Sequence, residues 1–311
     1  MRLLAAFPDR VLSYDDGDRR AVFDGDVQCL DAGPLGAYCG TSDGVYRQSD
    51  GDPTEWTRVA DVGDVTAVAS ADSGVWAGTE PSAVYRAPDG ETFAECGGLT
   101  DLPSSGDWAF PPRPSTHHVR WVEPTPERLY VAVEAGALVR SPDGGETWQD
   151  RVPSGPYDTH SMATHGERPD LAYSAAGDGF YVTEDGGDSW RTEESGLDRT
   201  YCWSVVCDPG DPERVLVAAA NGPRSAHDAG TASSAVYRRD GRDADWERCE
   251  DLPGPDGLLA ASLAVTGAGD AVAATNRGLF RTDDWGASWA GIDAEWPTAL
   301  ESERPRGLVA R

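Results

Sequence analysis

The chain has 311 residues, with 54 acidic side chains against 26 basic ones, all of them arginine, and a formal net charge of −28. This charge balance argues against nucleic acid as a partner, because binding phosphates needs clustered positive charge. The sequence has no apolar run of eighteen residues, and its first ten residues turn charged too early for a secretory signal. We therefore expect no membrane span and a cytoplasmic location.

The chain begins with three short apolar runs, at residues 3–7, 11–14 and 20–23, which we expect to be β-strands. No turn motif closes this first group. A further apolar run at residues 306–310 has no neighbouring strands of its own. Pairing this last run with the first group would remove an exposed sheet edge.

An eight-residue motif, called here the repeat turn, occurs at residues 141–148, 183–190 and 282–289. Each copy reads Ser/Thr-x-Asp-x-Gly-x-Ser/Thr-Trp and follows a short β-like run. Degenerate copies close at Trp56, Phe93 and Trp246, so the closing aromatics fall at positions 56, 93, 148, 190, 246 and 289. This spacing suits four short strands per blade of a β-propeller.

We therefore predict an all-β fold in which residues 1–311 form a single domain. The predicted architecture is a seven-bladed β-propeller with a ring closed by the C-terminal strand, and six blades is the fallback. In each repeat turn the Asp would accept hydrogen bonds from N–H groups two or three residues on. The Gly would supply positive φ, and the Trp would pack between sheets. The repeat turns are thus structural, and their Asp residues are poor catalytic candidates.

The repeat turn resembles the Asp-box, or BNR, repeat of sialidase-like β-propellers. The resemblance covers nearly the whole chain and implies a glycosyl hydrolase-like fold. Sialidases of that family also carry an Arg-Ile-Pro segment, three carboxylate-binding Arg, a Tyr-Glu pair and an acid/base Asp. The chain contains no Arg-Ile-Pro, and none of those catalytic residues can be carried over. Similar repeats also build non-enzymatic proteins, namely sortilin-type receptors and a photosystem II assembly factor, so enzymatic activity stays open.

The acidic residues are spread over every predicted blade, and this composition resembles that of halophilic archaeal cytosolic proteins. Screening by concentrated salt would remove the self-repulsion of such a surface. Most carboxylates would then be an adaptation to concentrated salt, and the scarcer side chains carry more information about function.

Histidines gather where the repeat is irregular. Aligning three predicted blades on the ends of their first strands puts His118, His160 and Trp203 at one equivalent position. The first strand of each blade lines the central channel of a propeller, so we expect these side chains at one mouth of the channel. The corresponding segments of the other blades are less polar.

Two insertions should lie on the same face as these residues. Residues 97–116 contain Trp108 and Phe110, which we expect to be exposed as a lid or a contact patch, and residues 221–235 contain Arg224 and His227. Loops that enter first strands and loops that join second to third strands emerge together. The repeat turns emerge on the opposite face, so a rigid ring would present the insertions as a binding rim.

Three kinds of chemistry are open at this rim: metal binding, acid/base hydrolysis and clamping of a carboxylate by arginine. The catalytic candidates are His118, His160, Asp158 and Asp178. A divalent metal would bind histidines of this group together with Asp158, Asp178 or Asp228, and the main metal candidates are His118, His160 and His227. The predicted ligand-binding residues are His117, His118, Arg120, Asp158, His160, Trp203, Arg224 and His227.

The sequence thus leaves two functions open. The first is a site for a small polar molecule, such as a glycan or a carboxylate, in a binding protein or a non-sialidase hydrolase. The second is a scaffold that docks an unidentified protein on its rim. A deep pocket with converging His, Arg and Asp would favour the first, and a flat apolar rim the second.

Overall fold

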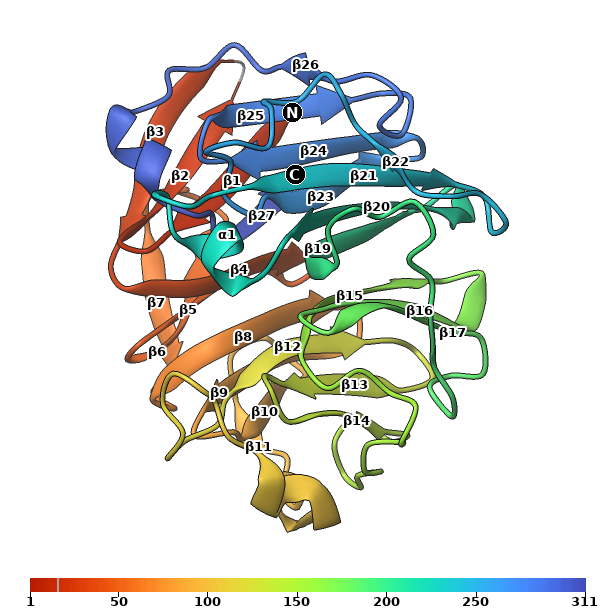
Figure 1. Ribbon diagram of the computed structural model, residues 1–311. Helices are drawn as coiled ribbons and strands as arrows, with labels where there is room; N and C mark the ends of the chain where they lie inside the picture. The colour runs from red at the N-terminus through yellow and green to blue at the C-terminus, as the bar shows by residue number, and fades with distance from the viewer. Residues whose placement is uncertain (16) are drawn as a thin grey trace.

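The computed structural model describes residues 1–15 and 17–311 and shows a seven-bladed β-propeller (Figure 1). Within these residues the strands form seven small antiparallel sheets arranged in a ring. The predicted all-β fold and the count of seven blades are confirmed. No helix in the described ranges has the length and hydrophobicity needed to cross a bilayer.

Each blade is named here by its order in the chain, and its strands are given from the channel outward. Blade 1 contains β27 (Gly307–Ala310), β1 (Arg2–Phe7), β2 (Arg10–Asp15) and β3 (Asp18–Asp24). Blade 2 contains β4 (Val27–Gly33), β5 (Gly36–Thr41), β6 (Gly44–Gln48) and β7 (Trp56–Ala60). Blade 3 contains β8 (Asp64–Ala71), β9 (Gly74–Glu80), β10 (Val84–Ala87) and β11 (Ala94–Glu95).

Blade 4 contains β12 (Val119–Pro124), β13 (Leu129–Val133) and β14 (Ala137–Ser141), and an isolated bridge from Arg140 to Gln149 marks the place of a fourth strand. Blade 5 contains β15 (Thr159–His165), β16 (Arg168–Ala176), β17 (Gly179–Thr183) and β18 (Arg191–Thr192). Blade 6 contains β19 (Tyr201–Asp208), β20 (Asp211–Ala220), β21 (Ser234–Asp240) and β22 (Glu247–Arg248). Blade 7 contains β23 (Ser262–Gly267), β24 (Asp270–Thr275), β25 (Gly278–Thr282) and β26 (Ala290–Gly291).

Short helices lie outside the blades. They are η1 (Leu99–Asp101) and η2 (Pro103–Asp107) between blades 3 and 4, α1 (Pro223–His227) within blade 6, and η3 (Thr298–Ser302) before the last strand. That last strand, β27, pairs antiparallel with β1, from Leu3↔Ala310 to Ala6↔Gly307. The C-terminal strand therefore closes the ring as the innermost strand of blade 1, as predicted.

The three repeat turns make the same set of hydrogen bonds. In the first, Asp143 Oδ1 accepts from the N–H of Thr147 at 2.8 Å and Oδ2 accepts from the Thr147 hydroxyl at 2.6 Å, while Ser141 Oγ accepts from the N–H of Gly145. The other copies repeat these contacts around Asp185 and Asp284. The N–H groups that donate at 2.8–2.9 Å lie four residues on, further than predicted, because the turn spans the whole motif. In the degenerate copy Asp89 accepts from N–H groups two and three residues on, as predicted.

The third repeat turn has an unusual backbone. Gly186 and Gly187 in the second copy have φ of 70° and 88°, where an L side chain is disfavoured, but Trp285 occupies the first of these positions in the third copy with φ 51°. The left-handed conformation costs about 1–2 kcal/mol for such a residue. The Trp285 side chain is fully buried against blade 6, and this burial offsets the cost.

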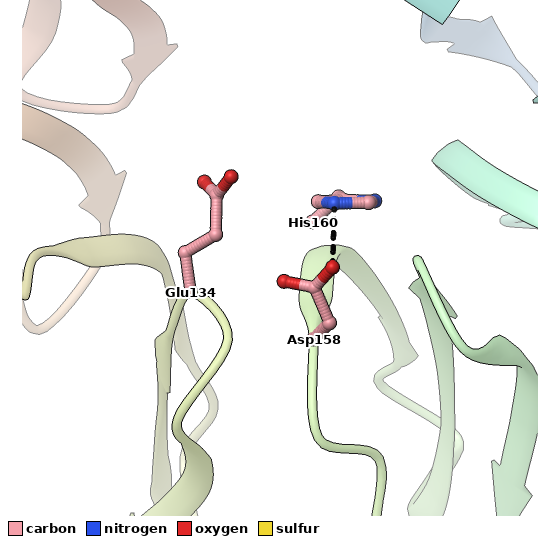
Figure 2. A group of neighbouring side chains, drawn as sticks. All are labelled: Glu134, Asp158 and His160. Carbon is pink, nitrogen blue, oxygen red and sulfur yellow. Dashed lines mark ion pairs between the residues drawn. The ribbon is translucent and has the colours of Figure 1, made fainter. Parts of the chain in front are cut away.

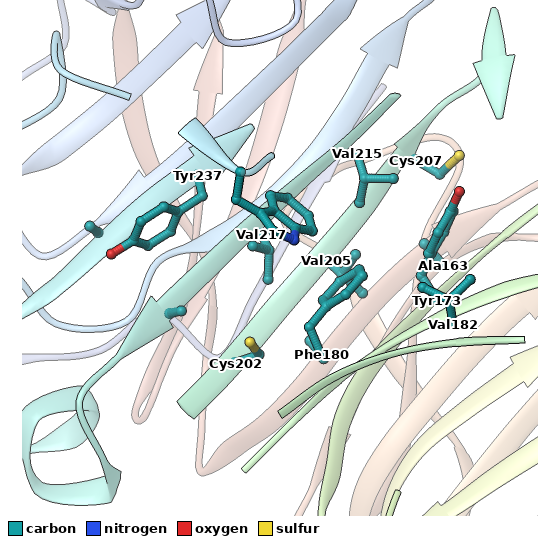
Figure 3. Close-up of a cluster of buried hydrophobic side chains, with 14 of the residues drawn as sticks. Ala163, Tyr173, Phe180, Val182, Cys202, Val205, Cys207, Val215, Val217 and Tyr237 are labelled. Carbon is teal, nitrogen blue, oxygen red and sulfur yellow. The ribbon is translucent and has the colours of Figure 1, made fainter. Parts of the chain in front are cut away.

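Hydrophobic packing between neighbouring blades forms the core. Between blades 5 and 6, Tyr173, Phe180 and Val182 pack against Cys202, Val205 and Val217 (Figure 3). The closing Trp246 of the blade 6 turn joins this cluster, with its ring 4.8 Å from that of Phe180. The six cysteines of the described chain are all free.

A ring of side-chain hydrogen bonds also joins the blades around the channel. In the described chain, each pair of neighbouring blades is joined by a hydrogen bond from a polar side chain near the channel. The side chain and its partner each lie on an inner strand or directly before one. The side chains that form this ring are Asp31, Thr66, Thr164, Ser161, Ser204, Ser262 and Arg306. The ring of bonds fixes each inner strand relative to its neighbour, and so fixes the side chains at the start of those strands.

Candidate functional site

The inner strands of blades 2 to 6 each begin with a β-bulge at one end of the channel, called here the channel mouth. The pairing register skips one residue in each of these strands. The extra residues are Gln28, Thr66, Arg120, His160 and Trp203. A bulge re-aims a side chain away from the regular ladder. Local strand geometry thus presents Arg120, His160 and Trp203 at equivalent positions of three consecutive blades.

The predicted equivalence of His118 with His160 and Trp203 is wrong, because Arg120 occupies that position. β15 and β19 each have a second irregularity at their ends, before His165 and Asp208, and β12 has none. Aligning the strands on their ends therefore shifted blade 4 by two residues. His118 lies just before β12 and still reaches the channel mouth.

Trp203 is the centre of a cluster of rings and cations at the mouth. Its ring centroid lies 4.4 Å from those of both His160 and His227. The guanidinium carbons of Arg120 and Arg304 lie 4.6 and 4.1 Å from the same ring. Cation–π contacts of this kind stabilise each cation by about 0.5–2 kcal/mol. The structure thus brings together four of the predicted ligand-binding residues, Arg120, His160, Trp203 and His227.

Glu134, in the loop between β13 and β14, connects His118 to this cluster. His118 Nε2 lies 3.0 Å from Glu134 Oε2 and Arg120 Nε lies 3.4 Å from the same oxygen. Burial raises the pKa of Glu134, but the His118 hydrogen bond and the Arg120 charge outweigh it and hold this pKa at about 2. Glu134 is therefore ionised near neutral pH and accepts the proton of His118 Nε2–H.

His160 is fully buried, and its tautomer follows from its partners. Nδ1 lies 2.7 Å from the carbonyl oxygen of Cys202, which can only accept, so Nδ1 carries a proton and donates. The other nitrogen, Nε2, lies 3.6 Å from Asp158 Oδ2 and 3.3 Å from the Tyr201 hydroxyl. The same hydroxyl lies 3.3 Å from His227 Nε2. Tyr201 has one proton to share between these two imidazoles.

Asp158 is held by the loops around it. Its Oδ1 accepts from the N–H of Ala135 at 2.8 Å, and its own N–H donates to Asp178 Oδ1 at 3.2 Å. Asp178 Oδ2 accepts from the N–H of Tyr157 and from the Tyr181 hydroxyl, so this predicted catalytic candidate supports the loop. A Cβ at Gly177 would lie 2.2 Å from Asp158 Oδ2, so glycine there leaves room for the carboxylate.

Sequence reasoning missed Arg304. This residue precedes β27, and within residues 1–15 and 17–311 its hydrogen-bond partner is the carbonyl oxygen of Pro305. No carboxylate lies within ion-pair distance of Arg304 in the described residues. Burial and the nearby Arg120 and Arg306 cations lower the pKa of Arg304 to about 9. Ring closure by the C-terminal strand could have predicted this position. If β27 is an inner strand, the segment before it reaches the channel mouth, as the segment before β12 does.

The predicted insertions contribute less to the mouth than expected. Trp108 is 5% exposed and packs in the core of blades 3 and 4, so the expected exposed aromatic lid is wrong in this respect. The N–H of Ser104, in η2, donates to Asp150 and holds this helix against blade 4. The indole ring of Trp108, which follows η2, is thereby buried between blades 3 and 4. Phe110 does reach the mouth, with its ring 4.8 Å from that of His118.

Two more predicted residues lie at the edge of the cluster. His117 packs edge-on against Trp108 at 5.7 Å, and burial followed by the neighbouring His118 lowers the pKa of His117. Arg224 is exposed in α1, and among the described residues the guanidinium groups over Trp203 are those of Arg120 and Arg304. His227, three residues on in the same helix, is the residue that turns toward Trp203. Burial and the Arg304 charge lower the pKa of His227.

The channel contains a cavity of about 450 Å³ that begins at this cluster. Arg120, His160 and Trp203 line the mouth end, and Asp31 and Glu123 line the walls further along the inner strands. A cavity of this size is in the range that holds small molecules. The cavity is therefore lined by the Arg120 and Arg306 cations, the His160 imidazole and the carboxyl groups of Asp31 and Glu123.

No protein-family model and no curated protein matches this sequence. Many solved structures share the fold. An ancestral GH74 enzyme superposes with a TM-score of 0.65 at 16% identity, covering 93% of this chain and 40% of that enzyme. This chain thus spans less than half the length of that enzyme.

Two further neighbours have different roles in their names. A GH74 enzyme of Niastella koreensis has a TM-score of 0.57 at 15% identity, over 94% of this chain and 57% of that one. YCF48 bound to a D1 peptide has a TM-score of 0.61 at 16% identity, over 92% of this chain and 86% of that one. At these identities the likeness establishes a propeller fold shared by glycosyl hydrolases and by a peptide-binding protein.

Proposed function

We propose that the channel mouth binds a small polar molecule that carries an anionic group, such as a carboxylate on a sugar. The observation that supports this function is the pair of guanidinium groups, Arg120 and Arg304, gathered over Trp203 at the opening of the cavity. Arg304 has no carboxylate partner in the described chain, whereas Arg120 Nε lies 3.4 Å from Glu134 Oε2 without a hydrogen bond. A ligand carboxylate would supply the anionic partner that Arg304 lacks.

Trp203, Tyr201 and the imidazoles would contact the rest of the ligand. The rings of Tyr201 and Trp203 lie nearly parallel, 6.4 Å apart, and flat apolar faces of this kind suit the faces of sugar rings. We also propose that the repeat turns belong to the Asp-box type, because all three make the same hydrogen bonds around their Asp. This relation concerns the ancestry of the fold and not the reaction.

A binding role for a protein partner on the rim is less well supported. In the described chain the large hydrophobic side chains that are exposed are Met1 and Tyr157, and Trp108 is buried. The flat apolar rim that a docking scaffold would need is therefore not formed there. The YCF48 neighbour bound to a peptide is alike in fold only, at 16% identity.

The test is calorimetric titration with glucuronate, galacturonate and their neutral parent sugars, on the wild type and on two variants. We expect the acidic sugars to bind and the neutral ones to bind at least ~10-fold more weakly, since a charge-assisted pair contributes about 1.5–3 kcal/mol. Arg304→Met should lose the preference for the acid. The double variant His118→Ala, His160→Ala should lose all binding, and because His160 is fully buried its far-ultraviolet circular dichroism must first be shown to match that of the wild type.

The exposed Arg224 supplies the matched control, because Arg224→Met removes a cation on the same face but outside the cluster. Equal binding of acidic and neutral sugars by the wild type would contradict the proposal. Incubation with aryl glycosides of the same sugars separates binding from hydrolysis, with release of the aryl alcohol as the readout.

A further inference from the structure

Three side chains from two neighbouring blades converge beside the cluster at the channel mouth. Glu134 lies in the turn after β13, Asp158 just before β15, and His160 at the bulge of β15 (Figure 2). One carboxylate oxygen from each acid and one imidazole nitrogen all lie within 4.8 Å of one another. His160 is fully buried, and the two acids are partly buried.

The protein holds each of these groups by one atom, and another atom of each faces the shared space. His160 donates from Nδ1 to the Cys202 carbonyl, so in the neutral ring Nε2 carries the lone pair, with the Tyr201 hydroxyl 3.3 Å away. Asp158 accepts the Ala135 N–H on Oδ1, and the Oδ2 atom is the one that lies 3.6 Å from His160 Nε2. Glu134 accepts from His118 on Oε2, which leaves Oε1.

This pattern is how proteins prepare ligands for a metal ion. A metal-binding imidazole usually donates its second N–H to a carbonyl or carboxylate, which fixes the ring and its tautomer. Two ionised oxygens and a neutral imidazole nitrogen suit Zn²⁺ or Mn²⁺, whereas Ca²⁺ requires six to eight oxygen ligands. Three protein ligands also leave coordination positions open, as in catalytic metal sites.

We propose that Glu134, Asp158 and His160 form a binding site for one divalent transition-metal ion, of the Zn²⁺ or Mn²⁺ type. This ligand set keeps His160 and Asp158 from the candidates that the sequence predicted and adds Glu134. His227 Nε2 is directed at the Tyr201 hydroxyl, and His118 Nε2 at Glu134, so neither of these histidines belongs to the set. His118 acts here by orienting Glu134.

The site does not depend on the anionic ligand proposed above. Arg120 and Arg304 lie on Trp203. Arg120 Nε also lies 3.4 Å from Glu134 Oε2, the oxygen that accepts from His118 and not the Oε1 proposed for the ion. A ligand carboxylate could contact the arginines with the metal position empty, and the ion could bind with no ligand present. The two functions are therefore tested separately.

The experiment uses the full chain, freed of metal by a chelator, and isothermal titration with ZnCl₂ and with MnCl₂ in 2 M KCl. Concentrated salt suppresses weak association of divalent ions with the many surface carboxylates. We expect one ion per chain. Co²⁺ added in place of Zn²⁺ should give visible absorption bands, which report nitrogen and oxygen ligation directly.

The isosteric variants Asp158→Asn and Glu134→Gln keep the oxygens that accept from Ala135 and His118 but place an amide group toward the metal. Each should weaken binding by at least 10-fold and remove the Co²⁺ bands. Because His160 is fully buried, His160→Gln can fail to fold, so the test relies on Asp158→Asn and Glu134→Gln. Asp228→Asn, on the exposed part of the same rim, and His165→Gln, at the far ends of the inner strands, are the matched controls and should bind as the wild type does.

Arg304→Met separates this inference from the proposed function, because it should lose the acidic sugar and keep the ion. The inference is overturned if the chain binds no ion under these conditions, or if Asp158→Asn and Glu134→Gln bind Zn²⁺ and Mn²⁺ with wild-type affinity. Binding of several ions with no dependence on these variants would place the ions on the acidic surface and overturn it equally.

Discussion

Asp31 and Glu123 place two carboxyl groups on the wall of the channel cavity, beyond the mouth. Glu123 accepts from Trp121 Nε1 at 2.9 Å and from the Thr164 hydroxyl at 2.8 Å, and Asp31 accepts from the N–H of Ser70. Burial raises the pKa of Glu123 to about 7 and that of Asp31 to about 6. Both groups therefore take up protons in the folded chain at a pH where the unfolded chain has released them.

This difference predicts how stability depends on pH. A carboxyl whose pKa is raised on folding stabilises the fold below its unfolded pKa of 4.5, and this contribution is lost as the pH rises to about 7. Glu123→Gln removes the ionisable group and keeps an acceptor and a donor. We expect the variant to be more stable than the wild type at pH 8 by about 1–2 kcal/mol, allowing for water in the channel, and equal to it near pH 4.5.

Urea unfolding at pH 4.5, 6 and 8 measures this effect. Glu127→Gln, in an exposed loop, is the control and should leave the pH dependence unchanged. If the free energy of unfolding changes between pH 4.5 and pH 8 by the same amount in the wild type and in Glu123→Gln, the pKa of Glu123 is not raised by folding and the prediction is wrong.

The site residues show what a sequence pattern can and cannot predict. His160 and Trp203 were identified because both are rare side chains at the start of inner strands. Arg120 was named only as a neighbour, because the second irregularities of β15 and β19 are backbone features that no residue type signals. Glu134 and Arg304 depend on contacts between separate blades, which the spacing of a repeat does not contain.

At the scale of elements, β27 joins two hydrophobic clusters with successive residues. Leu308 packs with Leu3 and Leu12 toward blade 7, and Val309 packs with Leu4 and Val11 toward blade 2. Both side chains are buried, at 7% and 8% exposed. The strand is therefore held by its own alternation as well as by its pairing with β1.

We expect deletion of residues 306–311 to destabilise the whole ring and not only blade 1. The deletion removes two buried aliphatic side chains, worth about 1.5–3 kcal/mol each, and exposes the edge of β1. The measurement is a thermal unfolding curve followed by circular dichroism. If the truncated chain does not fold, Leu308→Ala gives the graded version, with an expected loss of about 2–4 kcal/mol in a single transition. An unchanged Tm after the deletion would contradict closure by this strand.

At the scale of the whole molecule, the repeat predicted the fold well because each turn encodes its own geometry. The same hydrogen bonds recur around Asp143, Asp185 and Asp284, and each aromatic that closes a turn packs toward a neighbouring blade. The count of seven followed from the need to pair the last strand with the first group. The outward packing of η1 and η2 was not predictable, because it depends on the surface of blade 4.

The net charge of −28 predicts how the whole molecule responds to salt. We propose that the acidic surface is an adaptation to concentrated brine, where screening removes the self-repulsion of the carboxylates. We expect Tm to rise between 0.1 and 3 M KCl by ~5–10 °C, the shift that a few kcal/mol gives in a chain of this size.

Differential scanning calorimetry over the KCl series measures this response. A matched series in sucrose separates screening of charge from exclusion of solute from the surface. A Tm that stays level or falls with KCl would show that the acidic residues have another purpose.

The two ends of the chain lie side by side (Figure 1), and Arg2 and Arg311 exchange both backbone hydrogen bonds, at 3.0 and 2.8 Å. Every blade junction, including those of blade 1, has its own inner-strand bond, so the junctions next to the ends are built like the others. The position of the chain ends therefore has no structural role in the ring. A circularly permuted chain would form the same strand pairings, with a short linker between the present ends and new termini in the exposed turn before β22.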